Sequence, residues 1–72
     1  MGLRIREARA GNSLSQELLA DRVGVDRKTI SRVENGLISP KYDLIVDLAY
    51  ALNVRVEWLV EDPGRPPHGS AS

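Results

Sequence analysis

The sequence predicts an all-α domain of five short helices. Apolar residues recur at intervals of three and four along most of the chain, which is the spacing of helices that bury one face. No stretch alternates apolar and polar residues for long enough to indicate a strand, and no longer repeat is present. Residues that cap or end helices divide the chain into blocks of one to three turns.

Capping residues and glycines set the expected helix ends. Ser15 and Asp26 are good N-caps, because their side-chain oxygens can accept hydrogen bonds from the first turn of a helix. Gly24 and Asn35-Gly36 are suited to helix ends, because both residue types tolerate a positive φ. The expected helices are residues 3–10, 16–23, 27–34, 41–52 and 55–60.

The helices fall within a single domain, residues 1–61. Residues 62–72 are rich in Pro, Gly and Ser, and we expect them to form a disordered tail. The absence of cysteine excludes disulfides and thiolate zinc sites. No apolar run approaches the roughly 20 residues of a membrane span, so we expect a cytoplasmic, nucleoid-associated protein without a membrane partner.

The formal net charge of zero does not indicate a nucleic-acid partner, but the charge is unevenly distributed. Residues 1–32 carry seven bases and four acids, whereas residues 33–72 carry three bases and six acids. A domain of this kind can still present a positive face to phosphates. We therefore expect specificity to depend on a few contacts rather than on bulk charge.

Residues 16–34 have the pattern of a helix-turn-helix. Two capped helices of about two turns each are joined by a turn that contains Gly24, which makes them cross steeply. Their apolar faces can then close on the core while the second helix protrudes. A protruding helix of this kind fits the major groove of B-DNA.

The outer face of this second helix is cationic. At roughly 100° per residue, Ile30 and Val33 lie on the side opposite the polar residues. Arg and Lys side chains can donate to guanine O6 and N7, and each good bidentate pair contributes about 1–3 kcal/mol of base discrimination. Ordinary solvated cations are the alternative for this face taken alone. The polar outer residues are Arg27, Lys28, Ser31 and Arg32.

Several short groups of residues extend this pattern along the chain. They are Ile5-Arg6, Arg9, Leu14-Ser15-Gln16, Leu19-Ala20, Val23-Gly24-Val25, Thr29-Ile30-Ser31, Glu34-Asn35-Gly36, Pro40, Leu48-Ala49, Ala51-Leu52 and Glu57-Trp58-Leu59. Through them the chain resembles the Cro-type (Xre-like) phage-repressor helix-turn-helix family over nearly all of residues 3–60. The resemblance implies a compact, five-helix lambda-repressor-like domain that binds double-stranded operator DNA, and hence a transcriptional regulator, expected to be a repressor.

The resemblance also implies roles for individual residues. Arg27, Lys28 and Arg32 match the positions that contact base edges in the family, and Ser31 lies on the same face. An ion pair between Arg9 and Glu34 is implied as a structural contact between the first and third helices. The expected contacts with the DNA backbone are Gln16, Thr29, Asn35 and Lys41.

Three positions depart from the family pattern. Leu18 stands where an acid is usual, and it could be exposed or mark a contact. Ser13 replaces a common glycine, so Asn12 or Ser13 is expected to take the left-handed conformation at some cost. Asp26 replaces a more usual Ser or Thr cap, and its charge could exclude some phosphate approaches.

A two-fold homodimer is expected, since the fifth helix often supports one in this family. The candidate dimer residues are Val56, Trp58 and Leu59; for Trp58 a core or interface position is favoured over base stacking. An alternative is a protein-interaction module, such as an antitoxin or an adaptor for a regulator, that uses Leu18, Leu37, Ile38 and the acidic C-terminal half.

No catalytic chemistry is indicated. The sequence lacks a Ser-His-acid set, a metal motif and a glycine-rich phosphate loop, and His68 has no second ligand near it. We therefore expect no enzyme activity, no metal and no cofactor.

Overall fold

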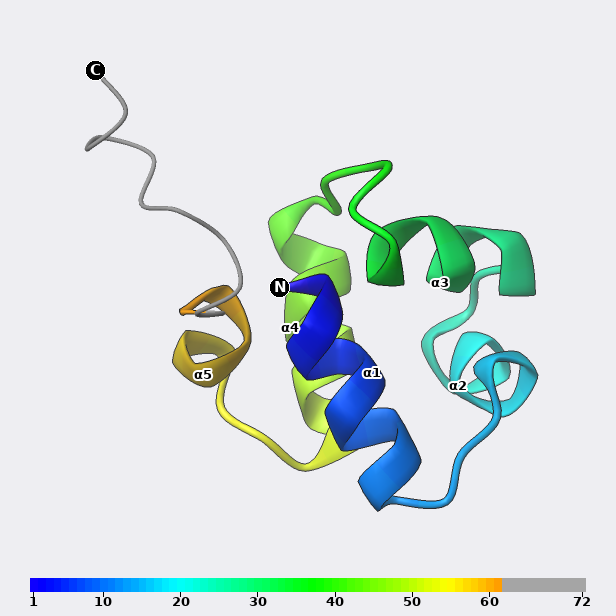
Figure 1. Cartoon of the computed structure of the whole chain (residues 1–72), viewed down its shortest axis with the longest axis horizontal. Helices are drawn as coiled ribbons and strands as arrows, with labels where there is room; N and C mark the ends of the chain where they lie inside the picture. The colour runs from blue at the N-terminus through cyan, green and yellow to red at the C-terminus, as the bar shows by residue number, and fades with distance from the viewer. Residues whose placement is uncertain (62–72) are drawn as a thin grey trace.

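The computed structural model describes residues 1–61, which form five helices and no strand (Figure 1). This confirms the predicted all-α, five-helix architecture. The predicted disordered tail, residues 62–72, lies outside the described residues. The helices are α1 (Gly2–Gly11), α2 (Gln16–Val23), α3 (Arg27–Glu34), α4 (Tyr42–Leu52) and α5 (Val56–Val60).

The capping residues account for where α2 and α3 begin. Ser15 Oγ accepts a hydrogen bond from the backbone N–H of Leu18 at 3.0 Å, and Asp26 Oδ1 accepts one from that of Thr29 at 2.9 Å. Each bond satisfies a donor that the first turn of a helix otherwise leaves without a partner. Both helices therefore have the predicted bounds.

The other helices differ from expectation by one residue at some ends. Helix α1 is longer by one residue at each end than predicted. Lys41 and Arg55 were expected inside helices, but their backbones are extended (ψ 161° and 146°) and they precede α4 and α5 as N-caps. Neither makes a side-chain cap bond, so the sequence offers no local signal for these two starts.

Two of the four residues with a positive φ among residues 1–61 lie in the turns on either side of α2. Gly24 has a φ of 76° between α2 and α3, which glycine adopts without steric cost. Ser13 has a φ of 57° between α1 and α2, so the left-handed residue is Ser13 rather than Asn12. Because a Cβ crowds the following carbonyl oxygen in this conformation, Ser13 carries strain that glycine would not.

Large aliphatic side chains from all five helices form one core. Helix α2 packs against α3 and α4, while α1 contacts α3, α4 and α5. Burial of each such side chain contributes about 1.5–3 kcal/mol. The residues buried most completely are Ile5, Leu19, Ile30, Leu48, Leu52 and Leu59.

The N-terminus of α1 touches the C-terminus of α3. A Cβ added at Gly2 would lie 2.7 Å from the carbonyl oxygen of Val33 and still closer to that of Glu34. Backbone cannot yield as a flexible side chain can, so only glycine fits without a shift of α1. This close approach fixes α1 against the helix that carries the predicted DNA-binding residues.

We expect Gly2→Ala to destabilise the fold by about 1–3 kcal/mol, because the new methyl group overpacks against backbone. Gly11→Ala is the matched control: a Cβ there meets nothing within 4 Å. Urea unfolding of both variants checks this. If Gly2→Ala were as stable as Gly11→Ala, the close approach of α1 to α3 would be wrong.

Candidate nucleic-acid interface

Helix α3 has a buried side and an exposed side. Ile30 and Val33 are buried, which fixes the rotation of the helix about its axis. The side chains of Arg27, Lys28 and Arg32 are exposed, and no other helix covers α3 on its upper side in Figure 1. Ser31 lies half-buried at the edge of this surface. The outward side thus carries three cations and no acid.

Asp26 adds a negative charge at the beginning of α3. Its Oδ1 accepts from both Thr29 Oγ1, at 2.7 Å, and Thr29 N, at 2.9 Å. These bonds lower the pKa of Asp26 below its ordinary value, with smaller contributions from the charges of Arg32 and Lys28. The carboxylate is therefore ionised at neutral pH. It offsets the unfavourable placement of two cations in the first turn.

The Thr29 hydroxyl group is already engaged by this cap. Thr29 is half-buried, and its Oγ1 donates its hydrogen to Asp26, so it has only acceptor capacity left. A phosphate needs donors. The predicted backbone contact from Thr29 would thus require its hydroxyl hydrogen to turn away from Asp26.

Glu34 is the only buried charged residue among residues 1–61, with a side-chain exposure of 0%. Arg9 Nε donates to Glu34 Oε2 at 2.6 Å, and Arg9 Nη2 donates to Oε1 at 3.2 Å. Arg9 Nη1 also donates to the carbonyl oxygen of Leu14 at 2.9 Å. The ion pair expected between α1 and α3 is present, and it is bidentate.

Gln16 bonds this carboxylate directly, whereas the side chain of Asn35 is held by other partners. Gln16, the first residue of α2, donates from Nε2 to Glu34 Oε1 at 3.1 Å. Asn35, which caps the C-terminus of α3, donates from Nδ2 to the carbonyl oxygen of Ser31 at 2.9 Å. Of the two residues expected at the DNA backbone, Gln16 thus bonds the buried charge, and Asn35 follows Glu34 directly in the chain.

Arg6 also belongs to this group, although the sequence pattern assigns it no role. Its Nη2 donates to Asn35 Oδ1 at 3.0 Å, and its Nε lies 3.6 Å from Glu34 Oε1. The available signal was helical spacing: Arg6 precedes Arg9 by three residues, so both lie on the same side of α1. The spacing alone does not predict a role for Arg6, because its partner Asn35 is 29 residues away in sequence and is brought near only by the fold.

The residues proposed for a dimer occupy different environments. Val56 and Trp58 are half-buried and pack against the core. The Arg4 guanidinium lies 4.7 Å from the centroid of the Trp58 ring, which leaves this ring unsuited to base stacking. Leu59 has an exposed fraction of 0%, so its prediction as a dimer contact is wrong: its side chain is part of the protomer core.

Two other residues singled out from the sequence, Lys41 and Leu18, lie at the surface. Lys41 is exposed in the segment that joins α3 to α4. Leu18, which departs from the family pattern, is 50% exposed on α2.

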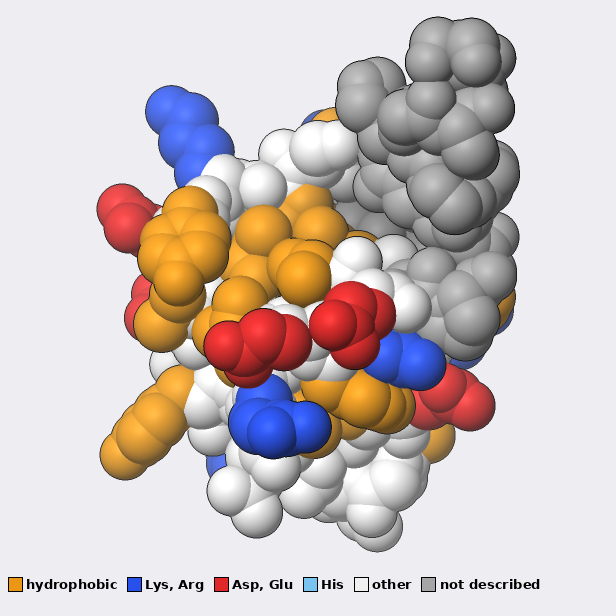
Figure 2. Space-filling model, turned by 90° about the vertical axis from the view of Figure 1, so that its left-hand side faces the viewer, with side chains coloured by type: hydrophobic (Ala, Val, Ile, Leu, Met, Phe, Trp, Pro, Cys, Tyr) orange, Lys and Arg blue, Asp and Glu red, His pale blue; other side chains and the backbone are white. Residues whose placement is uncertain are grey.

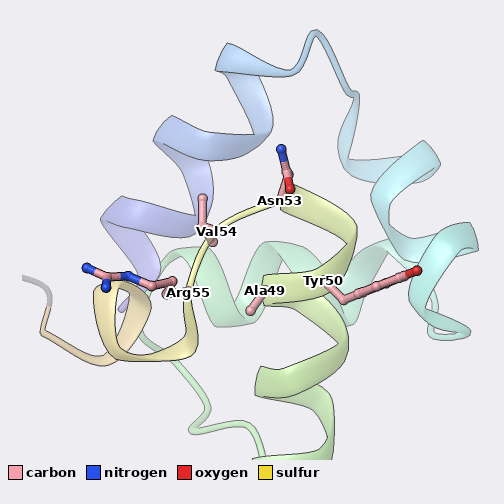
Figure 3. Close-up of a pocket in the computed structure, with 5 residues that line it drawn as sticks. All are labelled: Ala49, Tyr50, Asn53, Val54 and Arg55. Carbon is pink, nitrogen blue, oxygen red and sulfur yellow. The ribbon is translucent and has the colours of Figure 1, made fainter.

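An open hollow of about 650 Å³ lies where α4 ends and α5 begins (Figure 3). Its lining carries a phenol, an amide and a guanidinium as polar groups. The lining residues are Ala49, Tyr50, Asn53, Val54 and Arg55. Within residues 1–61, no group of three or more metal-binding side chains comes together, and no helix is both long and apolar enough to cross a membrane.

Comparisons with known proteins agree on one family. The helix-turn-helix family model matches residues 5–59. An uncharacterised HTH-type transcriptional regulator of Archaeoglobus fulgidus is 44% identical over 57 residues, which cover 79% of this chain and 81% of the relative.

Solved structures give the same result. The restriction-modification controller protein C.AhdI from Aeromonas hydrophila is 40% identical, with a TM-score of 0.77 over 81% of this chain and 88% of that one. The P22 c2 repressor in complex with synthetic operator 9T is 31% identical, with a TM-score of 0.78 over 81% of this chain and 88% of that one. The expected lambda-repressor-like fold is thereby confirmed.

We expect Arg9→Met to destabilise the protein by about 3–5 kcal/mol, because it leaves the Glu34 carboxylate buried without its main partner. Arg22→Met, at an exposed arginine of α2, is the control and should cost less than about 0.5 kcal/mol. Urea unfolding measures both. Equal stabilities of the two variants would show that the Arg9–Glu34 pair is not structural.

Proposed function

The chain belongs to the helix-turn-helix family and is a DNA-binding transcriptional regulator, and we propose that it binds an operator with α3 in the major groove. The observation that carries this proposal is the outward side of α3, with three exposed cations and no acid. The opposite side of the helix is held in the core by Ile30 and Val33.

Base reading is assigned to Arg27, Lys28 and Arg32. Each has a side chain long enough to reach a base edge from an exposed helix surface, and guanine O6 and N7 are the acceptors that suit these donors. Ser31 lies between them at the edge of the surface, where a hydroxyl group can donate to or accept from any base.

Contacts with the DNA backbone are assigned to residues that flank α3. Gln16 and Asn35 carry amide donors and are held by hydrogen bonds at the beginning of α2 and the end of α3. Lys41 adds an exposed cation beyond the loop, and Thr29 is a weaker candidate because its hydroxyl bonds Asp26. Such contacts fix the register of the protein on the duplex without reading its sequence.

We further propose a two-fold homodimer through the face on which α5 lies. Figure 2 shows hydrophobic side chains gathered across this face, with charged side chains beside them. On α5, Val60 is 50% exposed and Val56 and Trp58 are half-buried. Leu37 and Ile38, in the segment that joins α3 to α4, are 73% and 41% exposed. Operator half-sites one turn of DNA apart would require the two α3 helices of such a dimer to lie about 34 Å apart.

Such a dimer would act as a repressor, by occupying operator DNA that a transcribing polymerase needs. The P22 c2 repressor, which has the same fold, is seen with a synthetic operator. The proposal includes no catalysis, and it places the protein in the cytoplasm, on nucleoid DNA.

Replacement of Arg27, Lys28 or Arg32 by Ala is expected to weaken operator binding by about 1–3 kcal/mol and to relax preference at particular base pairs. Gln16→Ala and Asn35→Ala should weaken binding to all sequences alike. Selection from a random DNA pool followed by binding assays checks this, with Arg22→Ala as the control. Unchanged base preferences in all three α3 variants would contradict the assigned reading surface.

Val60→Glu is expected to convert the dimer to a monomer, because it places a charge in the apolar interface. Leu18→Glu is a matched control: Leu18 and Val60 are each 50% exposed, and the change in charge is the same. Sedimentation equilibrium gives the mass of each variant. A dimer that persists in Val60→Glu but dissociates in Leu18→Glu would place the interface on α2 instead.

A further inference from the structure

We propose that Arg6 of α1 binds a DNA phosphate, in one anion-binding cluster with Gln16 and Asn35 that the Glu34 carboxylate positions. This inference rests on the proposed function and adds α1 to the elements that contact DNA.

The cluster is organised around a single oxygen atom. Glu34 Oε1 accepts from Gln16 Nε2 at 3.1 Å and from Arg9 Nη2 at 3.2 Å, and Arg6 Nε lies 3.6 Å away. Arg6 Nη2 in turn donates to Asn35 Oδ1 at 3.0 Å. Donors from α1, α2 and the end of α3 therefore lie side by side.

The charge of the cluster is not balanced. Two guanidinium groups, those of Arg6 and Arg9, share the one carboxylate of Glu34. Arg9 uses its donors inside the fold, and its side chain is only 17% exposed. The excess positive charge thus falls on Arg6, which is 48% exposed and carries five N–H donors.

The two amides are oriented to donate as well. Asn35 Oδ1 faces the Arg6 guanidinium, and its Nδ2 bonds the Ser31 carbonyl oxygen at 2.9 Å and lies 3.5 Å from Ser31 Oγ, a long contact that a closer phosphate oxygen can replace. Gln16 Nε2 likewise uses one N–H on Glu34 and retains one. A phosphate oxygen needs such converging donors and a net positive charge.

Stability does not explain this placement of Arg6. An ion pair at 3.6 Å with a half-exposed partner contributes little to folding, and Glu34 is already paired bidentately with Arg9. What Arg6 adds is a charge beside two polar side chains at the surface, which suits an anionic ligand.

The test uses a short mixed-sequence DNA duplex, which reports phosphate contacts without any operator. Affinity is measured over a series of salt concentrations for the parent, Arg6→Gln, Arg6→Lys and Arg55→Gln. Arg55 is exposed at the beginning of α5, so this control loses the same charge elsewhere. Urea unfolding of each variant checks that the fold is retained.

Arg6→Gln should reduce the slope of log K against log salt by about 0.9, the value for one lost phosphate contact. Arg6→Lys, which keeps the charge, and Arg55→Gln should both keep the parent slope. In selection from random DNA, Arg6→Gln should retain the parent base preference, because phosphate contacts carry no sequence information.

Equal slopes for Arg6→Gln and Arg55→Gln, or unfolding of Arg6→Gln at clearly lower urea, would overturn the phosphate role while the proposed function stands. A parent protein without salt-dependent affinity for any duplex would overturn both.

Discussion

The buried carboxylate of Glu34 is the constraint on which the rest of the structure depends. Removing a charge from water is costly unless paired donors compensate it, and here Arg9 does so through two hydrogen bonds. Gln16 adds a third, and Arg6 lies nearby. Because these donors come from α1 and α2, satisfying one charge fixes both helices relative to the end of α3.

The fixed orientation of α3 explains how a protein with no net charge can bind DNA. The buried side of α3 contributes Ile30 and Val33 to the core, so the cations on the same helix all point outward. Six of the ten acids lie in residues 33–72, and the one acid within α3, Glu34, is buried and paired with Arg9. Local arrangement, and not total charge, determines the field that a phosphate meets.

Much of the fold could be predicted from the sequence because its signals are local. Ser15 and Asp26 cap the helices they were expected to cap, and the helical phase of α3 placed its exposed cations correctly. Contacts between residues far apart in the sequence could not be predicted from such local signals. Arg6 and Asn35 are 29 residues apart, and no propensity or spacing brings them together.

The burial of Leu59 is another feature that local sequence signals do not predict. In a five-residue helix, Val56, Leu59 and Val60 are all apolar, and the sequence does not say which of them faces inward. The packing of α5 against α1 and α4 buries Leu59 and leaves Val60 half-exposed.

The most direct measurement is an NMR map of chemical-shift changes when a selected operator duplex is added. We expect the largest changes at residues 27–32, at the side-chain amides of Gln16 and Asn35, and at Arg6 Nε. Changes confined to the exposed side of α4, at Tyr42, Val46 and Tyr50, with α3 unaffected, would contradict the assignment of α3 as the DNA-binding surface.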